Sequence, residues 1–222
     1  MNNKYSKIFT LVEKELSCSA HDMDHVARVY NLCEYLAKYE GNVDKEVLLL
    51  SALLHDIARA KEDNDTARVI RHEILGSEMA EEILLNEGYS SEIADKVKHC
   101  ITTHRFRSGN EPKSIESKIL FDADKLDAIG AVGIARAYVI AGEFSEKIYS
   151  AVVIDEYVKE NVVENGNLID ISKHAPNLEY ELKLKKIPER LYTKKAKEVA
   201  EGRIKFMELY FETIRMEIDG EK

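Results

Sequence analysis

The stretch EVLLLSALLHDIARAKED, residues 46–63, decides the fold class of this chain. Its apolar residues between Val47 and Ile57 fall on every side of a helix, a pattern typical of a helix that lies inside a core. The run ends in two polar neighbours, His55 and Asp56. Buried charge is costly unless it is paired, hydrogen-bonded or bound to a metal. The stretch therefore predicts a buried helix whose His-Asp pair needs a partner.

The rest of the chain is also predicted to be helical. Among 222 residues there are only three prolines and ten glycines, while Leu, Ile, Ala, Glu and Lys recur at three- and four-residue spacing. We expect an all-α helical bundle with helices near residues 3–17, 22–39, 44–60, 71–87, 91–104, 115–141, 143–164 and 193–218. No linker or repeat interrupts residues 1–222, which favours a single domain.

Residues 165–190, NGNLIDISKHAPNLEYELKLKKIPER, form the one long irregular stretch. A segment of this kind is expected to carry a short strand or β-hairpin, to cover the site as a lid, or to serve only as a surface connection.

Composition excludes several classes of protein. Forty-one acidic residues against 32 Lys and Arg give a formal charge of −9, which argues against a nucleic-acid or membrane-surface partner. The three cysteines are odd in number and lack a CxxC arrangement, so they indicate reduced side chains rather than disulfides or a zinc site. The N-terminal stretch interrupts its apolar residues with Lys and Glu, unlike a signal peptide. We expect a cytoplasmic protein that binds a small molecule, with a homodimer left open.

The stretch HDMDHVARVYNLCEYLA, residues 21–37, places a second histidine toward the core. His25 is in register with Val29, so it points inward, whereas Arg28 lies on a neighbouring part of that face and His21 sits where the helix begins. Taken alone, His25 fits an ordinary buried histidine with a hydrogen bond better than a ligand.

His55 and Asp56 change that balance. Adjacent side chains on a helix diverge by about 100°, so this pair can bind one ion only at the edge of its helix, with other helices completing the shell. His25 can supply one further ligand.

A fourth ligand should be a carboxylate, and SKILFDADKLDAIGAVGIARAY, residues 117–138, offers three. Asp124 shares a face with small and apolar residues, so it is the best inward candidate. For Asp122 and Asp127 a solvated or hydrogen-bonded role is at least as good an interpretation.

Two more histidines are predicted to face inward. His72 and His104 each align with the apolar residues of their helices, which makes them substrate contacts or ligands for a second metal. His99 lies on a polar face and His174 lies in the irregular stretch, so both are interpreted as structural.

The order His25, His55-Asp56, Asp124 resembles the H…HD…D motif of the HD superfamily of metal-dependent phosphohydrolases, which have an all-α fold. The resemblance is strengthened by the stretches HDMDHVARV, LLHDIA, DADKLDAIGAVGIAR and EYELKLKKIPERLYTKKAKEVAEGRIKFM. Together these stretches are similar to the bacterial YedJ/YpgQ-like branch of the superfamily, over most of the chain.

The resemblance implies that His25, His55, Asp56 and Asp124 bind one divalent cation. Two imidazoles and two carboxylates suit Mn first, with Mg, Co, Ni or Fe as alternatives, and octahedral coordination leaves positions for water and substrate. The ion would polarise a phosphoryl oxygen and lower the pKa of bound water.

The remaining site residues follow from the same resemblance. We expect Lys125 and Arg28 to bind phosphate, with a secondary set of substrate contacts consisting of His21, Arg59, His72 and His104. The catalytic set is predicted as Asp56, Lys125 and Asp127.

One position departs from the family pattern. Several HD phosphohydrolases carry a Glu three residues after the HD pair that helps to activate water, but this chain has Arg59 there. Either a later acid, such as Glu78 or Asp127, accepts the proton, or the reaction needs no dedicated base.

The leading functional hypothesis is cleavage of a nucleoside triphosphate to a monophosphate and pyrophosphate. A nucleotidase or phosphodiesterase of the same superfamily is the alternative within that class. From a different class, an oxidative enzyme with two irons would use His72 and His104 as further ligands, and metal stoichiometry would separate the two classes.

Overall fold

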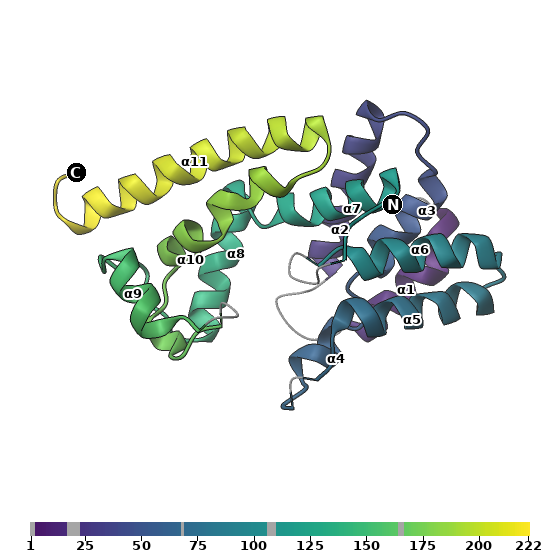
Figure 1. Ribbon diagram of the computed structural model, residues 1–222, viewed down its shortest axis with the longest axis horizontal. Coiled ribbons are helices and arrows are strands. Elements are labelled where there is room, and N and C mark those ends of the chain that lie inside the picture. The colour runs from purple at the N-terminus through teal and green to yellow at the C-terminus, as the bar shows by residue number, and fades with distance from the viewer. Residues whose placement is uncertain (1–2, 17–22, 68, 106–109, 164–166) are drawn as a thin grey trace. The chain divides into compact units, whose positions relative to one another are not determined.

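The computed structural model describes residues 3–16, 23–67, 69–105, 110–163 and 167–222 (Figure 1). The α-helices are α1 Ser6–Glu15, α2 Met23–Leu36, α3 Lys45–Leu54, α4 Arg59–Asp63, α5 His72–Asn86, α6 Ser91–Thr103, α7 Ile115–Asp127, α8 Gly130–Glu143, α9 Ile154–Asn161, α10 Pro176–Leu182 and α11 Lys194–Ile218. Short 3-10 helices cover Asn3–Tyr5, Ala37–Tyr39, Ile171–Lys173 and Leu184–Arg190. The described residues contain no strand beyond one isolated bridge, which confirms the all-α prediction.

The chain divides into two compact units. The first comprises residues 1–127 and 191–196, and the second comprises residues 128–190 and 197–222. The single domain expected for residues 1–222 stays a prediction.

In the first unit, α3 is the central helix. It packs against α2, α6 and α7, and α5 lies along α6 on the outside (Figure 1). Asp44 starts α3, because its carboxylate accepts hydrogen bonds from the backbone N–H groups of Glu46 and Val47 at 3.1 and 3.2 Å. Every residue from Val47 to Leu54 is buried, as the all-round apolar pattern predicts.

In the second unit, α8 packs against α10, and α11 contacts both helices through aromatic rings. The ring of Tyr138 on α8 meets Tyr210, and the ring of Tyr180 on α10 meets Phe211. None of the described helices in either unit is both long and apolar enough to cross a membrane.

The single helix predicted over residues 115–141 is wrong, because the chain breaks between α7 and α8. Ile129 is extended, and Gly130 has a φ of +81°, a left-handed conformation that glycine adopts without strain. A Cβ on Gly130 would also lie 2.9 Å from Cγ of Arg203. The break ends α7 directly after Asp127.

The helix predicted over residues 143–164 is also too long. The chain leaves α8 through Ser145, which has a φ of 56°, and the N–H of Glu146 donates to the carbonyl of Ala141 at 2.8 Å. A left-handed residue of this kind terminates helices. Helical structure resumes only at Ile154, after the extended Val153.

The stretch predicted as irregular, residues 165–190, is more helical than expected. Its described residues hold α10, which starts at Pro176 because proline is favoured in the first turn, and two short 3-10 helices. A β-hairpin is absent from the described residues, where Val162 and Leu168 form only an isolated antiparallel bridge. Its roles as a lid or a connection stay predictions.

Candidate metal centre

The structure brings together the four residues that the sequence proposes as metal ligands. His25 lies near the start of α2 and Asp124 lies in α7, while His55 and Asp56 follow the last residue of α3. We call these four residues the His25 group. Nε2 of His25 lies 3.3 Å from Nε2 of His55 and 3.5 Å from a carboxylate oxygen of each of the two aspartates.

The end of α3 explains how two adjacent side chains face one point. The predicted helix over residues 44–60 stops at Leu54, and residues 55–58 form a turn in which the N–H of Ile57 donates to the carbonyl of Leu54. His55 Nε2 and Asp56 Oδ2 are therefore 3.7 Å apart rather than diverging as on a continuous helix. The turn places both ligands at one end of the buried helix.

Two further histidines join the same centre through Asp56. Its Oδ1 lies 3.6 Å from Nε2 of His72 and 3.6 Å from Nε2 of His104, and these two nitrogens are 3.3 Å apart. We call Asp56, His72 and His104 the His72 group. Since Oδ2 of Asp56 faces the His25 group, this carboxylate is shared between two sets of potential ligands.

The Nδ1 atoms of the four imidazoles all point away from Asp56, and each has an oxygen partner. His55 and His104 stand directly after the last residues of α3 and α6, where helix carbonyls lack helical partners. Their Nδ1 atoms lie 2.9 and 2.6 Å from the carbonyl oxygens of Ala52 and Ile101, respectively. A carbonyl oxygen only accepts hydrogen bonds, so each Nδ1 carries the proton and each Nε2 presents a lone pair.

The other two imidazoles are held by carboxylates. His25 Nδ1 donates to Asp127 at 2.7 Å. His72 Nδ1 lies 3.1 Å from the donor Nη1 of Arg59 but only 2.6 Å from an oxygen of Glu62, and this shorter contact favours donation from His72 to Glu62. The same rule applies, because an ionised carboxylate is purely an acceptor. All four Nε2 atoms can therefore serve as metal ligands.

Facing lone pairs require a positive charge between them. Within each pair of histidines the Nε2 atoms are 3.3 Å apart, and burial lowers the pKa of His55 to about 4 and that of His72 to about 3. His55 and His72 are therefore neutral at pH 7, and a proton is not expected between the facing Nε2 atoms. Two ligand atoms about 2.1 Å from one cation, at right angles, would lie about 3 Å apart, close to the separations seen here. The donor set therefore fits a divalent cation.

Asp127 lies behind His25, outside the ring of Nε2 atoms. One of its oxygens accepts from Nδ1 of His25, and the other accepts from Nε of Arg28 at 2.7 Å. Nη2 of Arg28 also donates to Asp127 at 3.2 Å. Both carboxylate oxygens of the residue expected to accept a proton are therefore engaged by neighbouring side chains.

Lys125 lies at the edge of the His25 group. Its Nζ donates to Oδ2 of Asp124 at 2.6 Å and stands 5.4 Å from the centre of the Phe121 ring. Burial opposes ionisation of Asp124, but Lys125 and the nearby imidazoles hold its pKa below the ordinary value. Asp124 is thus anionic, with its other oxygen directed at His25.

Arg59 belongs to an ion-pair network behind His72. Its Nη1 lies 3.0 Å from Glu62 and 3.1 Å from Nδ1 of His72. Arg105 bridges Glu62 and the buried Glu73, with both distances 2.9 Å. Glu62, Glu73 and Arg105 were not among the predicted site residues, although Glu73 directly follows His72 and Arg105 directly follows His104 in the sequence.

The remaining predicted residues lie elsewhere. His21 is outside the described residues, and Glu78 is exposed on α5. Asp122 is buried, and it accepts hydrogen bonds from the N–H groups of Tyr192 and Thr193 and from the Thr193 hydroxyl. It has a structural role, which was one of the two interpretations offered.

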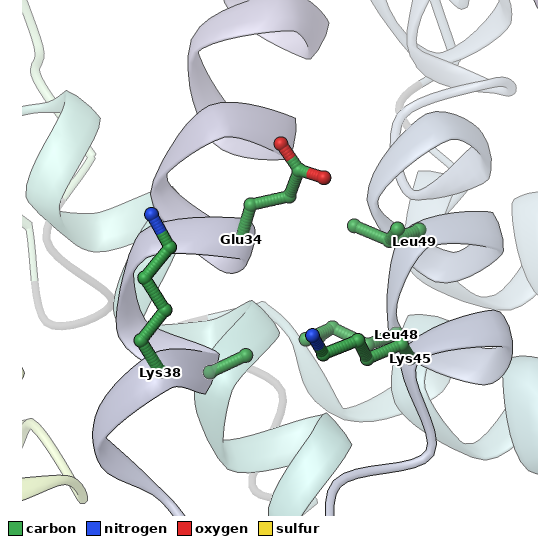
Figure 2. A pocket seen from close by; sticks show the side chains of 6 residues that line it. Glu34, Lys38, Lys45, Leu48 and Leu49 are labelled. Atoms are coloured by element: carbon green, nitrogen blue, oxygen red, sulfur yellow. The ribbon is translucent and has the colours of Figure 1, made fainter. Parts of the chain in front are cut away.

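A surface pocket is lined by residues of α2, of the 3-10 helix that follows it, and of α3 (Figure 2). Leu48 and Leu49 line it from α3, and the charged side chains of Glu34, Lys38 and Lys45 also line it. None of the residues of the His25 or His72 groups lines this pocket. Its mixed charges and surface position distinguish it from the buried centre.

Comparison with known proteins gives consistent matches. The family model described as HD domain matches residues 23–129, which include the His25 and His72 groups. The uncharacterized protein YpgQ of Bacillus subtilis is 32% identical over 206 residues, covering 91% of this chain and 86% of YpgQ.

Two solved structures extend the comparison to the fold. A crystal structure of B. subtilis YpgQ in complex with ADP matches with a TM-score of 0.71 and 30% identity, covering 96% of this chain and 94% of that one. A crystal structure of an HD-superfamily hydrolase from Bacillus thuringiensis matches with a TM-score of 0.71 and 26% identity, covering 97% of each chain.

Proposed function

Because this chain belongs to the HD domain family, whose members include metal-dependent phosphohydrolases, we propose that it cleaves nucleoside triphosphates to monophosphates and pyrophosphate. One observation carries the phosphohydrolase part: in the His25 group, His25, His55 and Asp56 lie 3.3–3.7 Å from one another, and Asp124 lies 3.5 Å from His25. The nucleotide part is supported by YpgQ, a relative solved with ADP.

The His25 group would hold one divalent cation. Mixed nitrogen and oxygen ligands suit Mn, with Mg, Co, Ni or Fe as alternatives. When bound, such an ion polarises a phosphoryl oxygen and makes water more acidic. His25, His55, Asp56 and Asp124 would hold the ion and leave positions open for water and a substrate oxygen.

Cationic side chains near the centre would bind the substrate phosphates. Lys125 is the best placed, since its Nζ already lies against Asp124 and only part of its side chain is exposed. Arg28 is partly exposed while it holds Asp127, so its guanidinium can reach both the protein and a ligand. Arg59 stands on the side of the His72 group. These cations would attract a small anion to a chain with a formal charge of −9.

We propose a cytoplasmic setting for this reaction, as the low number of cysteines and their lack of a CxxC arrangement indicate. Glu78, one of the two acids expected to accept a proton from the attacking water, is exposed on α5, so we do not propose it for this role.

The proposed reaction is tested by supplying Mn, Mg, Co and Ni separately with each nucleoside triphosphate and resolving phosphate from pyrophosphate. In oxygen-18 water, attack at the α-phosphorus labels the monophosphate. Label confined to released orthophosphate would instead establish a nucleotidase. Asp56→Ala serves as the inactive variant, and Asp122→Asn controls for loss of a buried carboxylate outside the centre.

A second candidate function rests on the shared position of Asp56. Six residues form the His25 and His72 groups together, and Asp56 directs one oxygen to each, so the centre has ligands for two ions. Two irons in such a centre would support oxidative chemistry. Metal analysis decides between the candidates: two irons per chain without phosphate hydrolysis would favour the oxygenase.

A further inference from the structure

His25 is the histidine whose orientation depends on a distant acidic side chain within the His25 group. His55 is fixed by a carbonyl of its own helix three residues earlier. His25 instead donates to Asp127, which is 102 residues away in sequence and lies on α7. An imidazole can exchange which nitrogen carries the proton, so this partner determines whether Nε2 of His25 is a ligand or a donor.

Asp127 is suited to this task by burial and by charge. It is 1% exposed, and its 2.7 Å contact with His25 is short, as expected for a charge-assisted hydrogen bond. Arg28 offsets its charge through two N–H groups, at 2.7 and 3.2 Å. A buried carboxylate with such a partner stays in place as an acceptor.

The placement of Asp127 at the last residue of α7 links it to the ligand Asp124. Both carboxylates contact His25, but at opposite nitrogens: Asp124 lies 3.5 Å from Nε2 and Asp127 lies 2.7 Å from Nδ1. One turn of α7 therefore supplies a ligand and the group that orients another ligand. The break at residues 128–129 ends the helix directly after this turn.

We propose that Asp127 is a positioning residue, which fixes the Nε2 lone pair of His25 toward the metal site while Arg28 holds Asp127 in place. The inference rests on the proposed metal-dependent function and replaces the expectation that Asp127 accepts a proton from water. Hydrogen-bond partners of metal-binding histidines typically contribute 10–100-fold to metal affinity.

The test measures Mn²⁺ affinity of the purified chain without nucleotide, in the wild type, Asp127→Asn and Asp122→Asn. An asparagine at 127 can donate as well as accept, so it no longer dictates which His25 nitrogen carries the proton. We expect Asp127→Asn to bind Mn²⁺ about 10–100-fold more weakly. Asp122→Asn, which removes a buried carboxylate of the same helix, should lower thermal stability and leave Mn²⁺ affinity unchanged.

A second readout uses the metal-free protein. Long-range proton–nitrogen NMR should show the His25 proton on Nδ1 in the wild type and a shifted tautomer population in Asp127→Asn. Unchanged Mn²⁺ affinity and tautomer in a folded Asp127→Asn variant that has lost hydrolysis would overturn the proposal in favour of proton transfer by Asp127.

The two readouts also separate this inference from the proposed function. Tight Mn²⁺ binding with the expected loss in Asp127→Asn, but without any nucleotide hydrolysis, would support the positioning role and reject the proposed reaction. Absence of binding of Mn²⁺ and of each alternative cation, Mg²⁺, Co²⁺, Ni²⁺ and Fe²⁺, by the wild type would overturn both.

Discussion

In both halves of the centre, the His25 group and the His72 group, a carboxylate contacts Nδ1 of one histidine from behind. The surroundings of this carboxylate differ between the two halves. In the His25 group, the carboxylate behind the histidine is Asp127, whose side chain is 2% exposed and is held by Arg28. In the His72 group, the corresponding carboxylate is Glu62, whose side chain is 17% exposed and contacts Arg59 and Arg105 as well as His72.

The His25 group also has more potential ligands and more carboxylates than the His72 group. The His25 group has four residues, including two carboxylates, whereas the His72 group has three and shares its only carboxylate, Asp56. Fewer charges and a more exposed support should bind a cation more weakly. We therefore expect the first ion to bind in the His25 group, and the His72 group to act as a weaker second site or as a substrate contact.

The largest effect should come from the residue that both halves share. Asp56→Ala should abolish metal binding and hydrolysis together, because it removes the oxygens that face both sets of histidines. The loss in turnover should exceed the ~10²–10³-fold that follows removal of one transition-state donor. Metal content is measured by elemental analysis after gel filtration. A folded variant with full metal occupancy would show that Asp56 has a structural role and is not a ligand shared by the two groups.

The comparison itself is tested by removing one histidine from each half. His25→Gln should eliminate tight binding of the first ion, whereas His104→Gln should leave one ion bound and weaken only the second. Titration with Mn²⁺, followed by activity at saturating metal, separates the variants. Equal losses of the first ion in both variants would show that the two halves form a single cooperative site.

Lys125→Ala should have an intermediate effect, confined to the His25 group. Removing a hydrogen bond to a charged phosphate costs about 1.5–3 kcal/mol, or roughly 10–160-fold in kcat/KM. The bound ion should remain, since Lys125 contacts Asp124 Oδ2 and leaves Oδ1 directed at His25. Lys118→Ala on the same helix is the matched control. Loss of the ion in Lys125→Ala would assign Lys125 to support of the metal site.

The sequence predicts which histidines face the core, but it does not predict the side chains that hold them from behind. The inward positions of His25, His72 and His104 follow from helical periodicity, which also predicts the all-α class that the structure confirms. Asp127 was among the predicted site residues, with a hydrogen-bonded role as one interpretation. Its partners could not be predicted in the same way, because Asp127 meets Arg28 across 99 residues and periodicity relates only neighbours on one helix.

Backbone breaks were the second limit. The spacing of apolar residues predicts continuous helices over residues 115–141 and 143–164. It does not predict the left-handed backbone conformations of Gly130 and Ser145. Such breaks depend on the conformation of one residue, and they set where the helix carrying Asp124 and Asp127 ends. The turn after Leu54 is similar, because it aligns His55 with Asp56 although the sequence pattern continues as a helix.

The smallest effect concerns a property that the two halves should share, the response of the metal-free protein to acid. Burial lowers the pKa of His55 to about 4 and that of His72 to about 3, below the value of about 6.5 in an unfolded chain. The unfolded state therefore binds more protons as the pH falls below about 6.5, so folding stability decreases toward pH 4.

Each histidine should contribute about 1.4 kcal/mol of lost stability between pH 7.5 and 5.5, or roughly 3–5 °C in Tm. Thermal unfolding in EDTA at the two pH values measures this difference. His55→Gln and His72→Gln should each reduce the Tm difference by a similar amount, because both imidazoles are buried and neutral. If only His55→Gln reduced it, His72 would be protonated in the folded state through Glu62, and the more exposed half of the centre would differ in charge as well as in ligands.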